Sequence, residues 1–380
     1  MKIATLQFAP KLGEIAANFS RAESLLMREE REGLLTGIDL LVLPELAFTA
    51  EPQNIRMAGG SLNHGLVVKV RGMEIDRFTG YNHPSLQAIA PFLEPTAAGP
   101  STKWAARTAK RLKCTVAVGY PEAAEGGNFN TVFDRHITAE EGSIAYNSLV
   151  FVSSTGDVVA HYRKSFLYYT DETWAQEGQG FWAGVLPVGG NGQQMKAVAG
   201  ICMDINPYKF EAPWTAYEFG NHAREARAKI VVISMAWLTR LSADELSSQV
   251  TVPDQDTMNY WINRLSPLFE SPGSIAEALV ICANRVGEEG TDPRLGDVRY
   301  AGSSCVMGMT AGRKIRIWDI LGRAQEGVLL VDTERDPLYS IVLKPADQTE
   351  PVSEAQKNDI KDNTTSELLS TGMERPDMQR

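Results

Sequence analysis

The stretch Ala197-Val198-Ala199-Gly200-Ile201-Cys202-Met203-Asp204 decides the fold class. Its first five residues are small or β-branched and predict a buried strand, which ends at Cys202, before Met203 and Asp204. A helical pattern at 217–229 follows, and then a second apolar strand at Ile230–Ser234. Because strand, helix and strand alternate, we expect an α/β protein in which helices cover a sheet.

Outward from this unit, the same alternation extends over most of the chain. Helical patterns are expected at 15–32 and 101–113. The later strands are separated by turns rather than helices, which predicts that part of the sheet is antiparallel. With no internal repeat and no dividing linker, one domain over residues 1–344 is expected. The expected strands are Ile3–Phe8, Leu40–Leu43, Thr115–Gly119, Asn147–Ser153, Val158–Tyr162, Ala197–Ile201, Ile230–Ser234, Leu279–Ala283, Ser303–Met307, Lys314–Trp318, Val328–Val331 and Tyr339–Leu343.

The composition excludes several classes of function. The 380 residues carry 37 basic and 47 acidic side chains, a net charge of −10, which argues against binding to nucleic acid or to an anionic membrane surface. No apolar run is long enough to span a bilayer, and residues 1–11 do not form a secretory signal. The four cysteines are widely spaced and are expected to be reduced thiols in a cytoplasmic protein, with the nucleus as a second compartment.

Residues 345–380 have a different composition from the rest. This segment has no aromatic residue and carries eight acidic and four basic side chains. Such a sequence cannot bury enough apolar surface to offset the entropy lost on ordering, so a disordered acidic tail is expected.

Three polar residues each follow an expected strand, namely Glu45, Lys164 and Cys202. Ligands in α/β proteins bind at strand ends, so these side chains are candidates for one site. Together they suffice for amide hydrolysis: a thiolate attacks the carbonyl carbon, a carboxylate moves protons, and an ammonium stabilises the oxyanion. A nearby lysine and a helix N-terminus are expected to lower the pKa of the thiol. Spacing alone leaves open that Cys202 is a packing residue.

Metal and phosphate chemistry find no support in the sequence. The five histidines are isolated, without the spacing of a zinc site, and no phosphate-binding glycine loop is present. We therefore expect neither a metal nor an organic cofactor.

The three candidates stand in motifs that resemble the carbon–nitrogen hydrolase (nitrilase) superfamily. They are Leu43-Pro44-Glu45, Tyr162-Arg163-Lys164 and Gly200-Ile201-Cys202-Met203-Asp204, in the order typical of that family. Longer segments resemble its fungal N-terminal amidase branch, and the likeness runs from residue 1 to about 332. These segments are 80–82, 91–95, 119–122, 163–172, 202–210 and 234–238.

The resemblance implies a four-layer α-β-β-α sandwich and a role for each residue. Glu45 would be the general base, Lys164 the oxyanion stabiliser and Cys202 the nucleophile, with the backbone N–H after Cys202 completing the oxyanion hole. The position that matches a second active-site glutamate, which orients the lysine, is Glu122. A solvated loop carboxylate is the alternative reading of Glu122.

The implied substrate is an N-terminal Asn or Gln of a protein, deamidated to Asp or Glu with release of ammonia. A free α-ammonium requires an acidic partner, for which Asp204, Asp171 and Glu172 are candidates, and Trp237 would form a pocket wall. Asp171 and Glu172 could instead favour the first turn of a helix capped by Thr170. Enzymes of an N-degron pathway would be partners, and the oligomeric state stays open. The alternatives are an amidase acting on small free amides or nitriles, and an inactive scaffold of the same fold.

One segment departs from the family pattern. Glu45 is normally followed closely by a Thr-Gly-Tyr turn, but here that turn comes at Thr79-Gly80-Tyr81, after an insert at about 50–78. The insert is either a translated intron or a true surface loop, since long insertions cost little closure entropy. A true loop would lie near Glu45 and could alter the site.

Overall fold

Two seven-stranded sheets form the centre of the molecule, a computed structural model in which residues 1–11, 14–49, 83–124, 129–132, 136–139, 142–270, 277–292, 294 and 296–343 are described. The first sheet has the order β17-β1-β2-β4-β7-β8, with β3 paired to β4. Its central pairs β1–β2 and β2–β4 are parallel and its outer pairs antiparallel. Its strands are β1 (Lys2–Gln7), β2 (Leu40–Val42), β3 (Glu94–Pro95), β4 (Thr115–Ala123), β7 (Ala145–Val152), β8 (Val158–Arg163) and β17 (Gly327–Asp332).

The second sheet has the order β18-β16-β15-β12-β11-β10-β9. Here β10, β11 and β12 are parallel, and antiparallel strands flank them on both sides. Its strands are β9 (Trp182–Val188), β10 (Gln193–Ile201), β11 (Ile230–Ser234), β12 (Ala278–Ala283), β15 (Cys305–Thr310), β16 (Lys314–Ile320) and β18 (Tyr339–Val342). Two hairpins stand apart, β5 (Phe129–Val132) with β6 (His136–Ala139) and β13 (Glu288–Asp292) with β14 (Gly296–Arg299).

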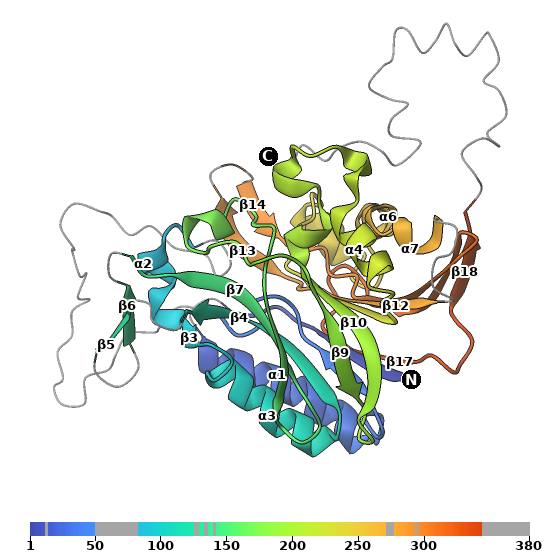
Figure 1. Cartoon of the computed structure of the whole chain (residues 1–380), viewed down its shortest axis with the longest axis horizontal. Coiled ribbons are helices and arrows are strands. Elements are labelled where there is room, and N and C mark those ends of the chain that lie inside the picture. The colour runs from blue at the N-terminus through green and yellow to red at the C-terminus, as the bar shows by residue number, and fades with distance from the viewer. Residues whose placement is uncertain are drawn as a thin grey trace, which may run out of the picture.

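Helices cover the outer face of each sheet, which gives four layers (Figure 1). Helices α1 (Ile15–Arg31) and α3 (Pro100–Leu112) lie against the first sheet. On the second sheet lie α4 (Glu218–Glu225), α6 (Gln255–Arg264) and α7 (Pro267–Glu270). The short helices are α2 (Leu86–Ile89), α5 (Ala243–Ser248), η1 (Ala90–Phe92), η2 (Asp171–Thr173), η3 (Cys202–Ile205), η4 (Tyr208–Phe210) and η5 (Trp214–Ala216).

Strand alternation divides the apolar side chains between these layers. In β2, Leu40 and Val42 belong to the core between the sheets, whereas Leu41 packs under the helices with Leu25 and Leu26 of α1. Successive residues of a strand point to opposite faces, so both faces of each sheet need apolar cover. This is why the strands are almost continuously apolar, as the sequence suggested.

The expected α/β class and the four-layer sandwich are confirmed, and so is the antiparallel part of each sheet. The helix expected at 217–229 is shorter, because Arg227 has a positive φ of 52° and ends it. Strand β9 and the β13–β14 hairpin were not predicted. The insert at 50–78 and the tail at 345–380 lie outside the described residues. Among the described helices, none combines the length and apolar character that crossing a bilayer requires.

Candidate active site

Three strand ends bring Glu45, Lys164 and Cys202 together between the sheets. Glu45 lies three residues after β2, and its backbone N–H donates to Met235 O of the other sheet at 3.3 Å. Lys164 follows β8 directly, and its Nζ donates to Glu45 Oε1 at 2.7 Å. Cys202 follows β10, and all three side chains are buried. The structure therefore brings these three side chains together, and their catalytic roles stay predictions.

Glu45 is held in place by three donors. Besides Lys164, Asn147 Nδ2 donates to Oε1 at 2.7 Å and the backbone N–H of Ala236 donates to Oε2 at 3.0 Å. Burial raises the pKa of the Glu45 carboxyl above its ordinary value, and Lys164 opposes that rise. A carboxyl with a raised pKa is a stronger base, which suits a group that must accept a proton from a thiol.

Asp171 is the second carboxylate on Lys164. Lys164 Nζ donates to Asp171 Oδ2 at 2.6 Å, and the same oxygen accepts the backbone N–H of Tyr168 at 3.0 Å. Asn147 Nδ2 donates to Asp171 Oδ1 at 3.0 Å, so one amide links both carboxylates. Burial alone would lower the pKa of Lys164, but Asp171 and Glu45 outweigh it and raise that pKa. Lys164 is therefore a fixed ammonium. Glu45, Lys164, Cys202, Asp171 and Asn147 are called the strand-end cluster below.

Cys202 stands at a strained turn between β10 and η3. Its φ is +40°, in the left-handed region that non-glycine residues avoid, and it begins the one-turn helix η3. The expected lowering of its pKa is wrong. Burial raises the pKa of this thiol well above its ordinary value, and Glu45 raises it further, against the opposing effects of Lys164 and the Ala236 N–H. Burial therefore favours the protonated form of the Cys202 thiol.

Asp204 serves the turn rather than the pocket. Its carboxylate is fully buried and accepts the backbone N–H of Ile201 at 2.7 Å and of Phe166 at 2.8 Å. Further donors are the Ser165 N–H and the Tyr162 hydroxyl. Asp204 thus joins the loop of Lys164 to the loop of Cys202, and this saturation corrects its expected role as an α-ammonium partner.

Glu122 lies on the other face of the first sheet from the strand-end cluster. Ser148 Oγ donates to it at 2.5 Å and Arg163 Nη2 at 2.5 Å, whereas the neighbours Asn147 and Lys164 point to Glu45. Adjacent strand residues face opposite sides, so Glu122 cannot share the side of Lys164. Burial alone would raise the pKa of Glu122, but hydrogen bonds from His161, Arg163 and Ser148 lower it to about 2. The expectation that Glu122 orients Lys164 is corrected: Asp171 contacts that lysine.

The remaining predicted residues lie at the edge of the cluster. Trp237 follows Ala236 and packs its ring against Tyr260, with centroids 5.1 Å apart, and edge-on to Trp261. Glu172 is exposed on η2, next to the buried Asp171. The helix turn considered for Asp171 and Glu172 is present as η2, but the Thr170 side chain does not cap it.

Sequence reasoning missed Asn147, the Ala236 N–H and the contact of Asp171 with Lys164. Asn147 had a usable signal, because asparagine is depleted in strands and here stands in a strand whose last four residues are all apolar. A backbone donor such as Ala236 leaves no trace in sequence.

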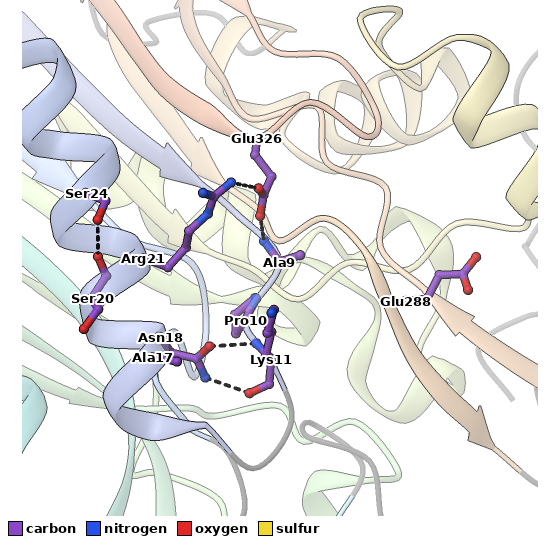
Figure 2. Close-up of a pocket in the computed structure, with 10 residues that line it drawn as sticks. All are labelled: Ala9, Pro10, Lys11, Ala17, Asn18, Ser20, Arg21, Ser24, Glu288 and Glu326. Atoms are coloured by element: carbon purple, nitrogen blue, oxygen red, sulfur yellow. Dashed lines mark hydrogen bonds and ion pairs between the residues drawn. The ribbon is translucent and has the colours of Figure 1, made fainter.

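A separate hollow of about 800 Å³ lies between α1 and the segment after β1 (Figure 2). Among the residues that line it, Arg21 pairs with Glu326, and Asn18 exchanges two hydrogen bonds with the backbone of Lys11. No group of three or more potential metal ligands occurs within the described ranges.

Comparison with known proteins shows the family of this chain. The sequence pattern of the carbon-nitrogen hydrolase family matches residues 2–207, more than half of the chain. The chain belongs to the carbon-nitrogen hydrolase family. A protein N-terminal amidase of Schizosaccharomyces pombe (strain 972 / ATCC 24843) is 29% identical over 349 residues, covering 88% of this chain and 100% of that protein. A protein N-terminal amidase of Saccharomyces cerevisiae (strain ATCC 204508 / S288c) is 22% identical over 309 residues, covering 78% of this chain and 57% of that protein.

Solved structures share the fold of this carbon-nitrogen hydrolase. A crystal structure of an N-terminal amidase with an Asn-Glu peptide superposes with a TM-score of 0.65 at 19% identity, covering 87% of this chain and 96% of that one. Another, with a Gln-Val peptide, gives the same values. At this identity the likeness concerns the fold.

Proposed function

We propose that this carbon-nitrogen hydrolase deamidates N-terminal Asn and Gln of proteins or peptides to Asp and Glu, with release of ammonia. The observation that carries the proposal is the buried contact of Lys164 with Glu45 next to the strained Cys202. The relative named protein N-terminal amidase, matched over its whole length, supports the choice of substrate.

The first half of the reaction forms a thioester. Glu45 takes the proton of the Cys202 thiol while Sγ attacks the side-chain amide carbon, since burial and Glu45 raise the pKa of that thiol and favour its protonated form. The Lys164 ammonium and the Met203 N–H stabilise the tetrahedral oxyanion. As the intermediate collapses, protonated Glu45 gives its proton to the leaving nitrogen, and ammonia departs.

The second half releases the acid. Glu45, again a carboxylate, takes a proton from water, whose oxygen attacks the thioester carbon. Collapse breaks the C–S bond, the Cys202 sulfur regains a proton from Glu45, and the product carboxylic acid leaves. Lys164 keeps its charge throughout because Asp171 and Glu45 both stabilise the ammonium.

Recognition of the α-ammonium falls to an acid other than Asp171 and Asp204, whose carboxylates are engaged with the protein. Glu172 is the predicted acid with an exposed side chain, and it lies close enough to Lys209 of η4 to raise the pKa of that lysine, after Tyr208. Since η4 follows the loop of Cys202, Glu172 lies beside the loops of the strand-end cluster. We infer that Glu172 binds the α-ammonium and that Trp237 forms a pocket wall.

The cellular setting follows from the product. An N-terminal amide converted to an acid would be passed to the enzymes of an N-degron pathway. Free, buried thiols at Cys114, Cys202, Cys282 and Cys305 support the cytoplasm as the compartment.

Three substrates test the proposal: an Asn-initiated peptide, its N-acetylated twin and free asparagine. Ammonia release and the amide-to-acid mass change are followed together, with Cys202→Ala as the inactive control. Turnover of the free-amine peptide alone is expected. Equal turnover of all three would assign a general amidase of small amides, and silence on all three would assign a scaffold.

A further inference from the structure

A second buried charge lies close to the strand-end cluster. Arg285 comes two residues after β12, and its side chain is fully buried. A ladder of backbone hydrogen bonds connects this strand end to Glu45: Met235 N donates to Ala283 O at 2.8 Å, and Glu45 N donates to Met235 O at 3.3 Å. The end of β12 and the loop of Glu45 thus border the same site.

Two residues of the β13–β14 hairpin region hold Arg285 in place. Its Nη2 forms an ion pair with Glu289, which also accepts the Tyr300 hydroxyl. The guanidinium lies over the Tyr300 ring, 4.7 Å from the ring centroid. Such a cation–π contact fixes the plane of the guanidinium as well as its position.

The hydrogen bonding of Arg285 differs from that of another buried arginine in this chain. Arg264 donates to Ile205 O through Nε at 2.7 Å, to Trp214 O through Nη1, and to Glu218 through Nη2. By contrast, Arg285 Nε and Nη1 are buried and meet no acceptor within the described structure. Each such donor costs free energy, so a purely structural arginine would be expected to resemble Arg264.

The field of Arg285 reaches Glu45. The negative charge of Glu45 is among the causes that raise the pKa of Arg285, after Glu289 and Tyr300 and against the effect of burial. The strand-end cluster has two carboxylates, Glu45 and Asp171, and one ammonium, so it carries one net negative charge when Glu45 is ionised. A second cation offsets that charge in a region of low dielectric.

We propose that Arg285 is a positioning residue that favours the ionised form of Glu45 in the resting enzyme. The other titratable groups that act on Glu45 are Lys164, Asp171, the Cys202 thiol and the Tyr300 phenol. The inference rests on Glu45 being the base of the proposed reaction, but it does not depend on which amide is the substrate.

Alkylation of Cys202 by iodoacetamide tests this without any substrate. The rate is measured against pH by mass spectrometry of the Cys202 peptide, and its acid limb reports the coupled Glu45–Cys202 pair. In Arg285→Met the acid limb should move up by about one pH unit, a tenfold slower reaction at the acid end. Arg285→Lys keeps the charge and should stay near the wild type. Glu289→Gln removes the counter-charge and should move the limb down.

Arg285→Met and Glu289→Gln should shift the acid limb in opposite directions. A loss of packing would shift it in the same direction in both variants, so the signs distinguish an electrostatic role from a structural one. The matched control is Arg299→Met, which breaks ion pairs with Glu288 and Asp297 on the same hairpin and should leave the profile unchanged. If neither buried-pair variant folds, Tyr300→Phe removes the hydroxyl that donates to Glu289 and loosens Glu289 from Arg285, so the limb should move down by a smaller amount than in Glu289→Gln. An unmoved limb in the variants that fold, or equal shifts in Arg285→Met and Arg285→Lys, overturns the inference.

The two proposals can fail separately. Absence of turnover on the three test substrates together with the expected alkylation shifts would reject the proposed function and keep Arg285 as a positioning residue. Turnover of the Asn-initiated peptide together with unchanged acid limbs of alkylation would keep the proposed function and reject the role of Arg285.

Discussion

Replacing Asp171 with Asn removes one of the two carboxylates that hold the Lys164 ammonium while preserving the shape of the side chain. The structure gives this change two consequences. Lys164 loses a charged contact of 2.6 Å, and Glu45 loses a neighbouring negative charge that raises its pKa. Asp171→Asn should therefore lower the rate and also shift its pH dependence.

The size of the rate loss follows from the role of Lys164. A misplaced oxyanion donor costs about 2.7–4 kcal/mol of transition-state stabilisation, or about 10²–10³-fold in kcat. KM should change little, because the interaction acts on charge that develops in the transition state. The sign of the pH shift is fixed: Asp171 raises the pKa of Glu45, so its removal lowers that pKa, and the acid limb of kcat/KM moves to lower pH.

The assay is ammonia release from an Asn-initiated peptide across the pH range. Glu172→Gln is the matched control for the neighbouring acid and should raise KM without moving the acid limb. Glu122→Gln tests the other carboxylate once expected to contact Lys164. The reasoning is refuted if Asp171→Asn keeps kcat within threefold of the wild type, or if Glu122→Gln reproduces its pH shift.

Three further changes give distinct outcomes. Cys202→Ala should abolish turnover with an unchanged circular dichroism spectrum, and residual turnover would reject Cys202 as the nucleophile. Cys114→Ala, at another buried cysteine, should lower stability and leave kcat unchanged. Burial raises the pKa of Glu94 to about 7, so the free energy of unfolding should fall as pH rises from about 4.5 to 7. Urea titrations at these two pH values measure that fall. In Glu94→Gln it should be smaller by about 3 kcal/mol. Gly200→Ala should lower stability by about 1–3 kcal/mol, because the added Cβ would lie 2.7 Å from the Phe219 ring; an unchanged melting temperature would show that α4 can shift.

The sequence predicted the catalytic candidates because these residues come just after expected strands. Glu45, Lys164 and Cys202 each follow an apolar run, and the end of such a run can be read from local pattern. Most strands of the two sheets and the helices α1 and α3 were predictable for the same reason, since periodicity and turn residues act over a few positions. The arrangement in four layers was expected from the family resemblance.

The partner of Lys164 could not be read in that way. Glu122 comes shortly after an expected strand and Asp171 follows Lys164 by seven residues, so the sequence offers both as partners of Lys164. The choice depends on the face of the first sheet to which Glu122 and Lys164 point. Strand pairing sets that face, and a shift of one residue would exchange the two sides. The role of Asp204 was misjudged because its four donors come from two segments distant in sequence, residues 162–166 at the end of β8 and Ile201 at the end of β10.

By itself, the sequence determined the α/β class, the likeness to the carbon-nitrogen hydrolases and the three residues expected to carry the chemistry. Tertiary structure alone decided that Asp171 holds Lys164, that burial raises the pKa of the Cys202 thiol, and that Arg285 is buried with Glu289 and Tyr300. The physical reason is that residue type and periodicity are local, whereas burial and charge proximity are created by strands that come from distant parts of the chain. The pKa of a side chain depends on this burial and on these neighbouring charges.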